Sequence, residues 1–168
     1  MKSNFNLNTL KGKMAEQLIQ DLFQQNGYNV FSFGLERQHP MLSQKLKYNN
    51  NKTSTDLRFM PDFVVQSTKN GDLFYLEVKF RSDGCFKFDE KYESYPYKNA
   101  WFVVVSPEKI QCMHYKRLKL KYEITPQKNY TLSGVKSFHI NPEQLAEYES
   151  YARLMFQSFK KSESYAGK

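Results

Sequence analysis

The stretch RFMPDFVVQSTKNGDLFYLEVKF, residues 58–80, predicts two neighbouring β-strands that carry a group of charged side chains. Its two halves, residues 57–66 and 72–80, are rich in aromatic and β-branched residues, which favour strands. The pair Asn70-Gly71 between two such halves is a strong signal for a tight hairpin turn. The stretch therefore predicts an antiparallel β-hairpin.

A two-residue turn at positions 70–71 would fix the register of this hairpin. Lys79 would then lie opposite Asp62, and Glu77 would lie opposite Val64. Asp62 and Glu77 would be diagonal neighbours on one face, roughly 7–8 Å apart at their backbones, and could share one metal ion. The same alternation places four apolar side chains on the other face, against a core: Phe74, Leu76, Val78 and Phe80.

A third carboxylate precedes the hairpin on a predicted helix, residues 10–25. Leu10, Met14, Leu18 and Leu22 recur every four residues and form an apolar stripe. Glu16 lies at the flank of that stripe, so its carboxylate can be directed along the sheet surface. Residues 1–8 before the helix are expected to be a loose polar lead.

The order of these motifs resembles that of the PD-(D/E)XK nuclease superfamily, and most closely its small single-domain members that are similar to archaeal Holliday junction resolvases. The resemblance covers about residues 9–105, and three segments carry it: Gly12-Lys13-Met14-Ala15-Glu16, Arg58-Phe59-Met60-Pro61-Asp62 and Glu77-Val78-Lys79. It implies a restriction endonuclease-like α/β fold, with a mixed central β-sheet flanked by helices.

The resemblance also implies which residues form the active site. These are Glu16, Asp62, Glu77 and Lys79, with the backbone carbonyl of Val78 as a further metal ligand. An endonucleolytic cut that leaves a 5′-phosphate is implied as well. The segment between residues 66 and 111 contains no glutamine, so the glutamine motif of RecB-like nucleases is missing and an exonuclease of that branch is disfavoured.

The chemistry of phosphodiester hydrolysis explains the need for these residue types. Carboxylates such as those of Asp62 and Glu77 bind Mg²⁺ or Mn²⁺, and such an ion offsets the negative charge of the phosphate and activates water. Glu16 could orient the attacking water or help to hold a second ion. Lys79 could position that water and stabilise the charge that develops on the phosphate. Taken one at a time, each residue could instead be an ordinary solvated charge.

The charge balance favours nucleic acid as a partner, and DNA is the expected kind because of the resemblance to DNA nucleases. The chain has 25 Lys and Arg against 17 Asp and Glu, a net charge of +8 over 168 residues. Residues 115–122 alternate like a strand, which would form either a basic stripe that follows phosphates or a solvated edge that discourages aggregation. The candidate residues for contact with nucleic acid are Arg58, Arg81, Arg117, Lys119 and Lys121.

The remaining sequence predicts a single domain over residues 1–168. Residues 44–55 are expected to be a turn-rich surface loop. Residues 82–99, rich in Phe and Tyr, could wall the active site or simply pack. Asn141-Pro142 begins a predicted helix that ends near residue 160 and either packs on the domain or forms a homodimer contact.

No signal-peptide pattern, membrane span, cysteine framework or zinc-ligand spacing is found in the sequence, so a reducing cytoplasm without a membrane partner is expected. The leading hypothesis is a metal-dependent nuclease, and more specifically a DNA endonuclease. The alternatives are a module that binds nucleic acid without catalysis, and an interaction protein with no affinity for nucleic acid.

Overall fold

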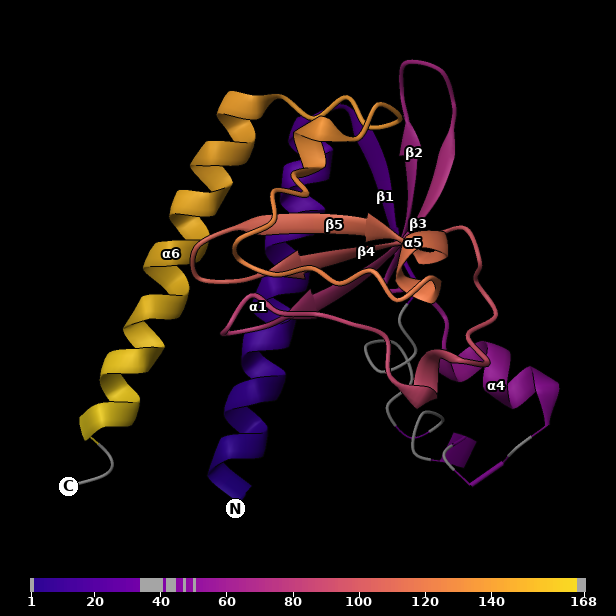
Figure 1. The fold of residues 1–168 in the computed structure, drawn as a ribbon, viewed down its shortest axis with the longest axis horizontal. Helices are drawn as coiled ribbons and strands as arrows, with labels where there is room; N and C mark the ends of the chain where they lie inside the picture. The colour runs from indigo at the N-terminus through magenta and orange to yellow at the C-terminus, as the bar shows by residue number, and fades with distance from the viewer. Residues whose placement is uncertain (1, 34–40, 42–44, 47, 50, 166–168) are drawn as a thin grey trace.

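A five-stranded mixed β-sheet lies at the centre of this α/β domain (Figure 1). The computed structural model describes residues 2–33, 41, 45–46, 48–49 and 51–165. The strands follow chain order across the sheet: β1 (Tyr28–Ser32), β2 (Phe63–Ser67), β3 (Leu73–Phe80), β4 (Ala100–Val105) and β5 (Ile110–His114). All neighbouring strands are antiparallel except β3 and β4, which are parallel.

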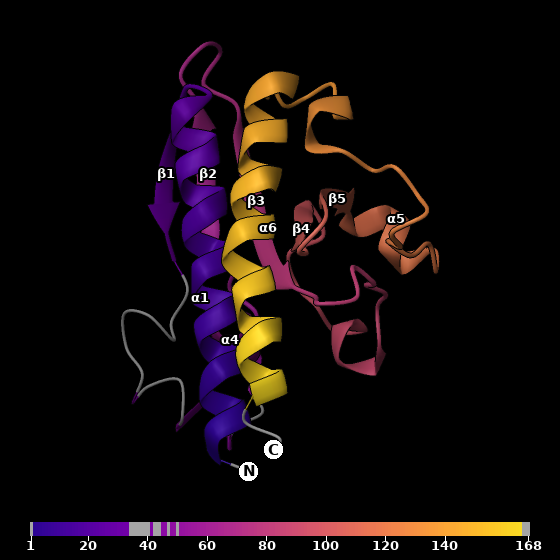
Figure 2. The same ribbon diagram turned by 90° about the vertical axis from the view of Figure 1, so that its left-hand side faces the viewer.

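Two long helices lie side by side over one face of this sheet, as Figure 2 shows. They are α1 (Lys2–Gln25) and α6 (Pro142–Tyr165). The shorter helical segments are α4 (Lys52–Arg58), η1 (Glu90–Tyr92), α5 (Tyr115–Lys119) and η2 (Leu132–Gly134). None of the helices built from the described residues is both long and apolar enough to cross a membrane.

The side chains of β3 alternate between the two faces of the sheet, and the four predicted apolar ones face a core, as the sequence predicts. Leu76 and Val78 are buried against α1 and α6, and Phe74 and Phe80 pack beside them. Tyr75, Glu77 and Lys79 must therefore point to the opposite face of the sheet, because successive residues of a strand alternate. That opposite face is where the predicted catalytic pair lies.

An irregular aromatic segment covers this opposite face. Phe102 of β4 is fully buried there, and the rings of Phe86, Phe88, Tyr92 and Tyr95 surround it with centroids 4.9 to 5.6 Å away. Edge-to-face and stacked rings at such distances stabilise a core beyond the area that they bury. Residues 82–99 therefore pack as a second core.

The register of the hairpin differs from the predicted one. Phe63 pairs with Leu76 and Gln66 pairs with Leu73, so every partner is shifted by two residues. The Ser67 amide donates to the Asp72 carbonyl at 2.9 Å, so residues 68–71 form a four-residue loop, and the Asn70 side chain binds Asp72 at its end. A shift of two residues keeps every side chain on its predicted face, whereas a shift of one would have exchanged the faces.

Three other expectations require correction. The predicted loose lead is helical, because α1 begins at Lys2. Several residues of the predicted loop 44–55 lie outside the described residues, and its last four, 52–55, begin α4. The segment 115–122 is not a strand: His114 Nδ1 accepts the Lys116 amide at 3.2 Å and starts the short helix α5, in which Tyr115 and Leu118 are buried.

The predicted C-terminal helix is confirmed, together with its start. The side-chain oxygen of Asn141 accepts hydrogen bonds from the amides of Glu143 and Gln144 at 2.8 and 3.3 Å. These bonds satisfy two of the amide groups that a helix leaves free at its first turn. The apolar side of α6, including Leu145, Ala152 and Phe156, is buried in the core shared with α1.

Candidate functional site

Asp62 and Glu77 come together where β2 begins beside β3. The ladder between these strands starts with the Phe63–Leu76 pair, so Asp62 lies one residue outside it. Its Oδ2 atom accepts the backbone amide of Val78 at 2.7 Å, and its carbonyl accepts the amide of Phe33 at 3.0 Å. The first bond holds Asp62 against the segment of β3 that carries Glu77, and the second ties it to the residue that follows β1.

Lys79 lies on the same face of β3 as Glu77, two residues further on. Its Nζ atom forms an ion pair and hydrogen bond with Oε1 of Glu77. The two side chains are largely buried, with 23% of Lys79 and 12% of Glu77 exposed. A buried carboxylate needs a positive partner, and Lys79 supplies one.

The electrostatic environment of Glu77 favours its protonated form. Burial is the largest cause and raises the pKa of Glu77 to about 7, and the carboxylates of Asp62 and Glu16 add to this effect. The ammonium group of Lys79 acts in the opposite direction and partly offsets it. The pKa of Lys79 is raised in turn, because the Glu77 and Asp62 charges outweigh the effect of burial. A perturbed carboxyl group of this kind is typical of functional sites.

Glu16 approaches the same region from α1. It is half-buried and lines a cavity of about 500 Å³ at the end of β3, together with Val78, Lys79 and Arg81. The first half of α1 is therefore brought to the carboxyl end of the strand that carries the Glu-x-Lys motif. The three predicted carboxylates thus share one electrostatic neighbourhood, although they come from three elements.

The donor set suits a magnesium-like ion held by few protein ligands. Across the part of the chain that the structure describes, no three His, Cys, Asp or Glu side chains lie close enough together to hold a metal ion. Mg²⁺ commonly keeps several waters and uses only one or two carboxylates as protein ligands. The Asp62–Glu77 pair therefore matches Mg²⁺ in the type and number of its ligands. The negative charges of Asp62 and Glu77 repel each other, and a cation bound between them would relieve this repulsion.

Tyr95 is a polar group in this region that sequence reasoning missed. It is 2% exposed, and its hydroxyl finds no hydrogen-bond partner among the described residues. Burial, followed by the charges of Glu77 and Asp62, raises its pKa. A buried hydroxyl without a partner is costly, so Tyr95 adds a free donor beside the two carboxylates. Only its place in the aromatic segment after β3 could have pointed to it.

Two of the predicted basic residues lie near this region. Arg81 follows β3 directly, lines the cavity beside Glu16, and has its guanidinium 5.5 Å from the ring centre of Phe86. Arg58 is exposed at the end of α4, one residue before Phe59, whose ring contacts Tyr95 with centroids 5.7 Å apart.

The other three predicted basic residues do not form a stripe. Arg117 stacks on Tyr122 and Tyr130, with its guanidinium carbon 4.9 and 5.0 Å from the ring centres. Lys119 donates to the carbonyl of Glu93 at 3.4 Å, and Lys121 lines a different hollow. The three side chains would share one face only if residues 115–122 formed a strand, but Tyr115–Lys119 form the helix α5.

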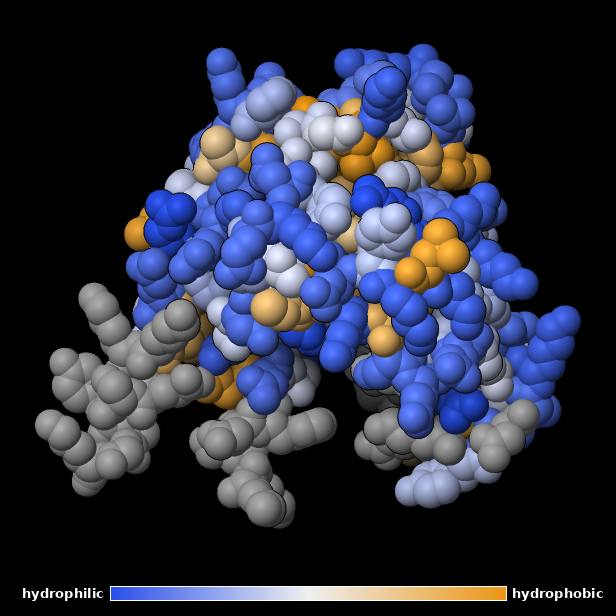
Figure 3. Space-filling model, in the orientation of Figure 1, coloured by the Kyte–Doolittle hydropathy of each residue, from blue (hydrophilic) through white to orange (hydrophobic). Residues whose placement is uncertain are grey.

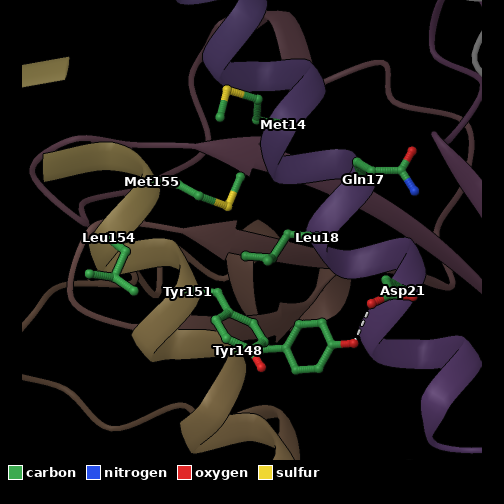
Figure 4. A pocket seen from close by; sticks show the side chains of 8 residues that line it. All are labelled: Met14, Gln17, Leu18, Asp21, Tyr148, Tyr151, Leu154 and Met155. Atoms are coloured by element: carbon green, nitrogen blue, oxygen red, sulfur yellow. Dashed lines mark hydrogen bonds between the residues drawn. The ribbon is translucent and has the colours of Figure 1, made fainter. Parts of the chain in front are cut away.

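A second hollow of about 470 Å³ lies between α1 and α6, and neither Asp62 nor Glu77 lines it (Figure 4). Met14, Leu18, Leu154 and Met155 give it an apolar lining, and its hydroxyl groups are already used, as in the bond from Tyr148 to Asp21. None of the eight described residues that line it is cationic. Its chemistry does not suit a phosphate, so it is not part of the candidate site.

Comparison of the chain with models of known protein families, with the sequences of curated proteins and with solved structures finds no match. The assignment of the site therefore depends on the geometry of the described residues and on the sequence motifs.

Replacing Tyr95 with Phe tests whether its hydroxyl has a protein partner. The free energy of unfolding of Tyr95→Phe should be unchanged or up to about 1 kcal/mol higher, because no hydrogen bond within the protein is lost. The matched control is Tyr97→Phe, which removes the 3.1 Å bond to the Asp56 carbonyl and should lower the free energy by about 1 kcal/mol. Equal losses in urea unfolding of the two variants would show that the Tyr95 hydroxyl is satisfied internally.

The raised pKa of Glu77 predicts a specific dependence of stability on pH. Between pH 4.5 and about 7 the folded protein binds more protons at Glu77 than the unfolded chain, so the stability that Glu77 contributes is lost as pH rises through this window. Relative to the unmodified protein, Glu77→Gln should gain on the order of 1–3 kcal/mol across the window in urea unfolding with EDTA. The exposed substitution Glu108→Gln serves as the control. Parallel profiles for all three proteins would contradict the burial of an acid at position 77.

Proposed function

We propose that this protein is a metal-dependent nuclease of the PD-(D/E)XK type that hydrolyses phosphodiester bonds, most plainly as a DNA endonuclease. The observation that carries the proposal is the placement of Asp62 against β3 by its 2.7 Å bond to the Val78 amide, beside the buried Glu77–Lys79 pair. A purely structural role gives little reason to place the half-buried Asp62 beside the largely buried Glu77–Lys79 pair, because each charge loses hydration.

Asp62 and Glu77 are the side chains that would hold Mg²⁺ or Mn²⁺. The backbone carbonyl of Val78 is a suitable third ligand, because the N–H and C=O groups of a strand residue point to the same side, and the Val78 N–H points to Asp62. Bound there, the ion would offset the negative charge of the phosphate and would make water a better nucleophile.

The neighbouring residues have roles that follow from their chemistry. Lys79 holds its ammonium group at the site and can stabilise charge that develops on the phosphate. Glu16, from the other side of the cavity, can orient water. The hydroxyl of Tyr95, which has no hydrogen-bond partner among the described residues, can donate to a phosphate oxygen or to water. Burial strengthens the interactions of Glu77 and Tyr95 in particular, because the local dielectric constant is low.

The order of elements is compatible with a restriction endonuclease-like fold. A long helix, α1, precedes the three antiparallel strands β1, β2 and β3, and β4 then returns parallel to β3. The crossover from β3 to β4 contains only the short helix η1, so the aromatic segment stands in the place where a parallel connection usually has a long helix.

The overall charge supports nucleic acid as the substrate. The net charge is +8, and the face in Figure 3 is mainly hydrophilic, with apolar side chains exposed in small separate groups. Such a surface attracts a polyanion and does not resemble a broad hydrophobic protein interface.

Two further features of the proposal concern its setting. A reducing cytoplasmic location suits Cys85 and Cys112, both of which are free thiols. A homodimer, if it forms, would use the apolar hollow between α1 and α6, where Leu154 is 72% exposed.

The second candidate function is a module that binds nucleic acid without cutting it. The observation that favours it is the lack, among the described residues, of a group of three metal-ligating side chains. The Lys79–Glu77 ion pair is compatible with it as well, because the lysine already neutralises that carboxylate.

A cleavage assay distinguishes these two functions. Labelled four-way junction, flap, duplex and single-stranded DNA and RNA are incubated with Mg²⁺ or Mn²⁺. Asp62→Asn and Glu77→Gln should each reduce cleavage by roughly 100-fold or more while binding is retained, because only the metal ligands change. Glu108→Gln removes a carboxylate at an exposed position and should cut normally. Full activity in Asp62→Asn would reject the site, and binding without any cleavage would favour the non-catalytic module.

A further inference from the structure

A polar cavity of about 340 Å³ lies at the far edge of the sheet, between β5, α5 and the segment 129–137. Its lining combines flat rings with positive charge, and the residues that matter are Trp101, His114, Arg117, Tyr130, Lys136 and Ser137. Its volume lies within the range of small-molecule sites. The pair Asp62 and Glu77 is not part of its lining.

Two aromatic rings hold Arg117 in place at this cavity. Its guanidinium lies over the rings of Tyr122 and Tyr130, at 4.9 and 5.0 Å. Within the described part of the chain no carboxylate pairs with it, so its N–H donors are not committed to a salt bridge. Stacking uses the faces of the guanidinium plane and leaves the in-plane N–H groups available for a planar or tetrahedral anion.

The aromatic part of the cavity is also fixed in position. Tyr130 is anchored by its backbone, because its amide donates to the Gln111 side chain at 3.1 Å and its carbonyl accepts the Cys112 amide at 2.8 Å. Trp101 packs edge-on against His114, with ring centres 4.9 Å apart. His114 Nδ1 already accepts a backbone amide, so in the neutral ring the proton lies on Nε2, which is a donor.

The charge of the cavity distinguishes it from the neighbouring hollow that contains Lys121. The described residues that line the cavity include no Asp or Glu, whereas Arg117 and Lys136 are both among them. The hollow at Lys121 is lined by Asp89, Glu90 and Glu93, which would repel an anion. Of the three basic residues predicted to form a stripe in residues 115–122, only Arg117 therefore lines the cavity.

We propose that this cavity binds one nucleotide unit, with its phosphate on Arg117 and Lys136 and its base against Trp101 and Tyr130. Arginine suits a phosphate because its N–H fork matches the oxygens, and base–aromatic stacking is tolerant of base identity. The nucleotide unit can come from a free nucleotide or from one residue of a nucleic-acid strand. The inference depends on the chemistry of the cavity and does not require the protein to be a nuclease.

The test uses the intrinsic fluorescence of Trp101, which is the single tryptophan of the chain. The full-length protein is titrated in EDTA with AMP, adenosine, inorganic phosphate and a short oligothymidylate, with a labelled oligonucleotide to follow binding separately by anisotropy. A saturable change in Trp101 emission with AMP identifies a free nucleotide as ligand, and a change with the oligonucleotide alone identifies a strand residue. Either result supports the site, and adenosine should bind more weakly because it lacks the phosphate.

Matched variants link this signal to the proposed contacts. Arg117→Gln should weaken binding about ten-fold, the loss expected for one charge-assisted contact. Lys136→Gln should weaken binding in the same direction, and it tests the cavity without disturbing the rings that Arg117 stacks on. Lys121→Gln removes the same charge outside the cavity and should change the dissociation constant by no more than about two-fold. Circular dichroism and thermal unfolding verify that each variant is folded.

Two results would overturn the inference. The first is anisotropy that reports oligonucleotide binding while Trp101 emission stays constant with every ligand. The second is an equal loss of affinity in Arg117→Gln, Lys136→Gln and Lys121→Gln, which would indicate general charge attraction. Because EDTA prevents metal-dependent cleavage, failure here leaves the proposed nuclease site untouched, and loss of cleavage in Asp62→Asn leaves this cavity untouched.

Discussion

The hydrogen bond from the Val78 amide to the Asp62 carboxylate links the fold to the candidate site. Asp62 precedes the β2–β3 ladder, and its side chain continues the contact with β3 where the backbone pairing has not yet begun. Its carbonyl accepts the amide of Phe33 and so also anchors it to the β1 side. Asp62 is thereby held by two neighbouring chain segments, through its backbone and its side chain, which fixes its position relative to Glu77.

The two faces of the sheet have different roles around this contact. Helices α1 and α6 cover one face with an aliphatic and aromatic core, and this packing supplies most of the apolar burial expected to stabilise the domain. The other face is covered by rings from residues 82–99, among which a lysine, two carboxylates and a tyrosine hydroxyl are gathered. Aromatic rings exclude water without adding charge, so the polar groups beneath them interact strongly with one another.

Much of this arrangement could be predicted from the sequence, because it depends on periodicity. The four-residue repeat of Leu10, Met14, Leu18 and Leu22 predicts α1, the Asn141 cap predicts the start of α6, and the alternation in β3 separates Glu77 from the core. These features are local, and local patterns are strongly constrained by backbone geometry.

The remaining features depend on contacts between distant residues or on competition between local bonds. The hairpin register differs from the predicted one because a four-residue loop closed by backbone bonds between Ser67, Gly71 and Asp72 replaces the two-residue turn. The alternation of basic and apolar residues from Arg117 to Tyr122 is typical of a strand. The His114 side chain instead caps a short helix, which begins at Tyr115. Tyr95 lies in an irregular segment whose course only tertiary packing defines. The partners of a charged residue are therefore harder to predict than the face it occupies.

The most direct test of the central claim is calorimetric titration of the protein with Mn²⁺ at pH 6.5, in buffers of different ionisation enthalpy. If Asp62 and Glu77 hold the ion, binding should release a fraction of a proton, approaching one, because Glu77, with a pKa of about 7, must ionise to become a ligand. Asp62→Asn should weaken binding by at least about ten-fold, and Glu77→Gln should also abolish the proton release. Binding of equal strength in all three proteins, with no proton released, would show that these carboxylates do not form a metal site.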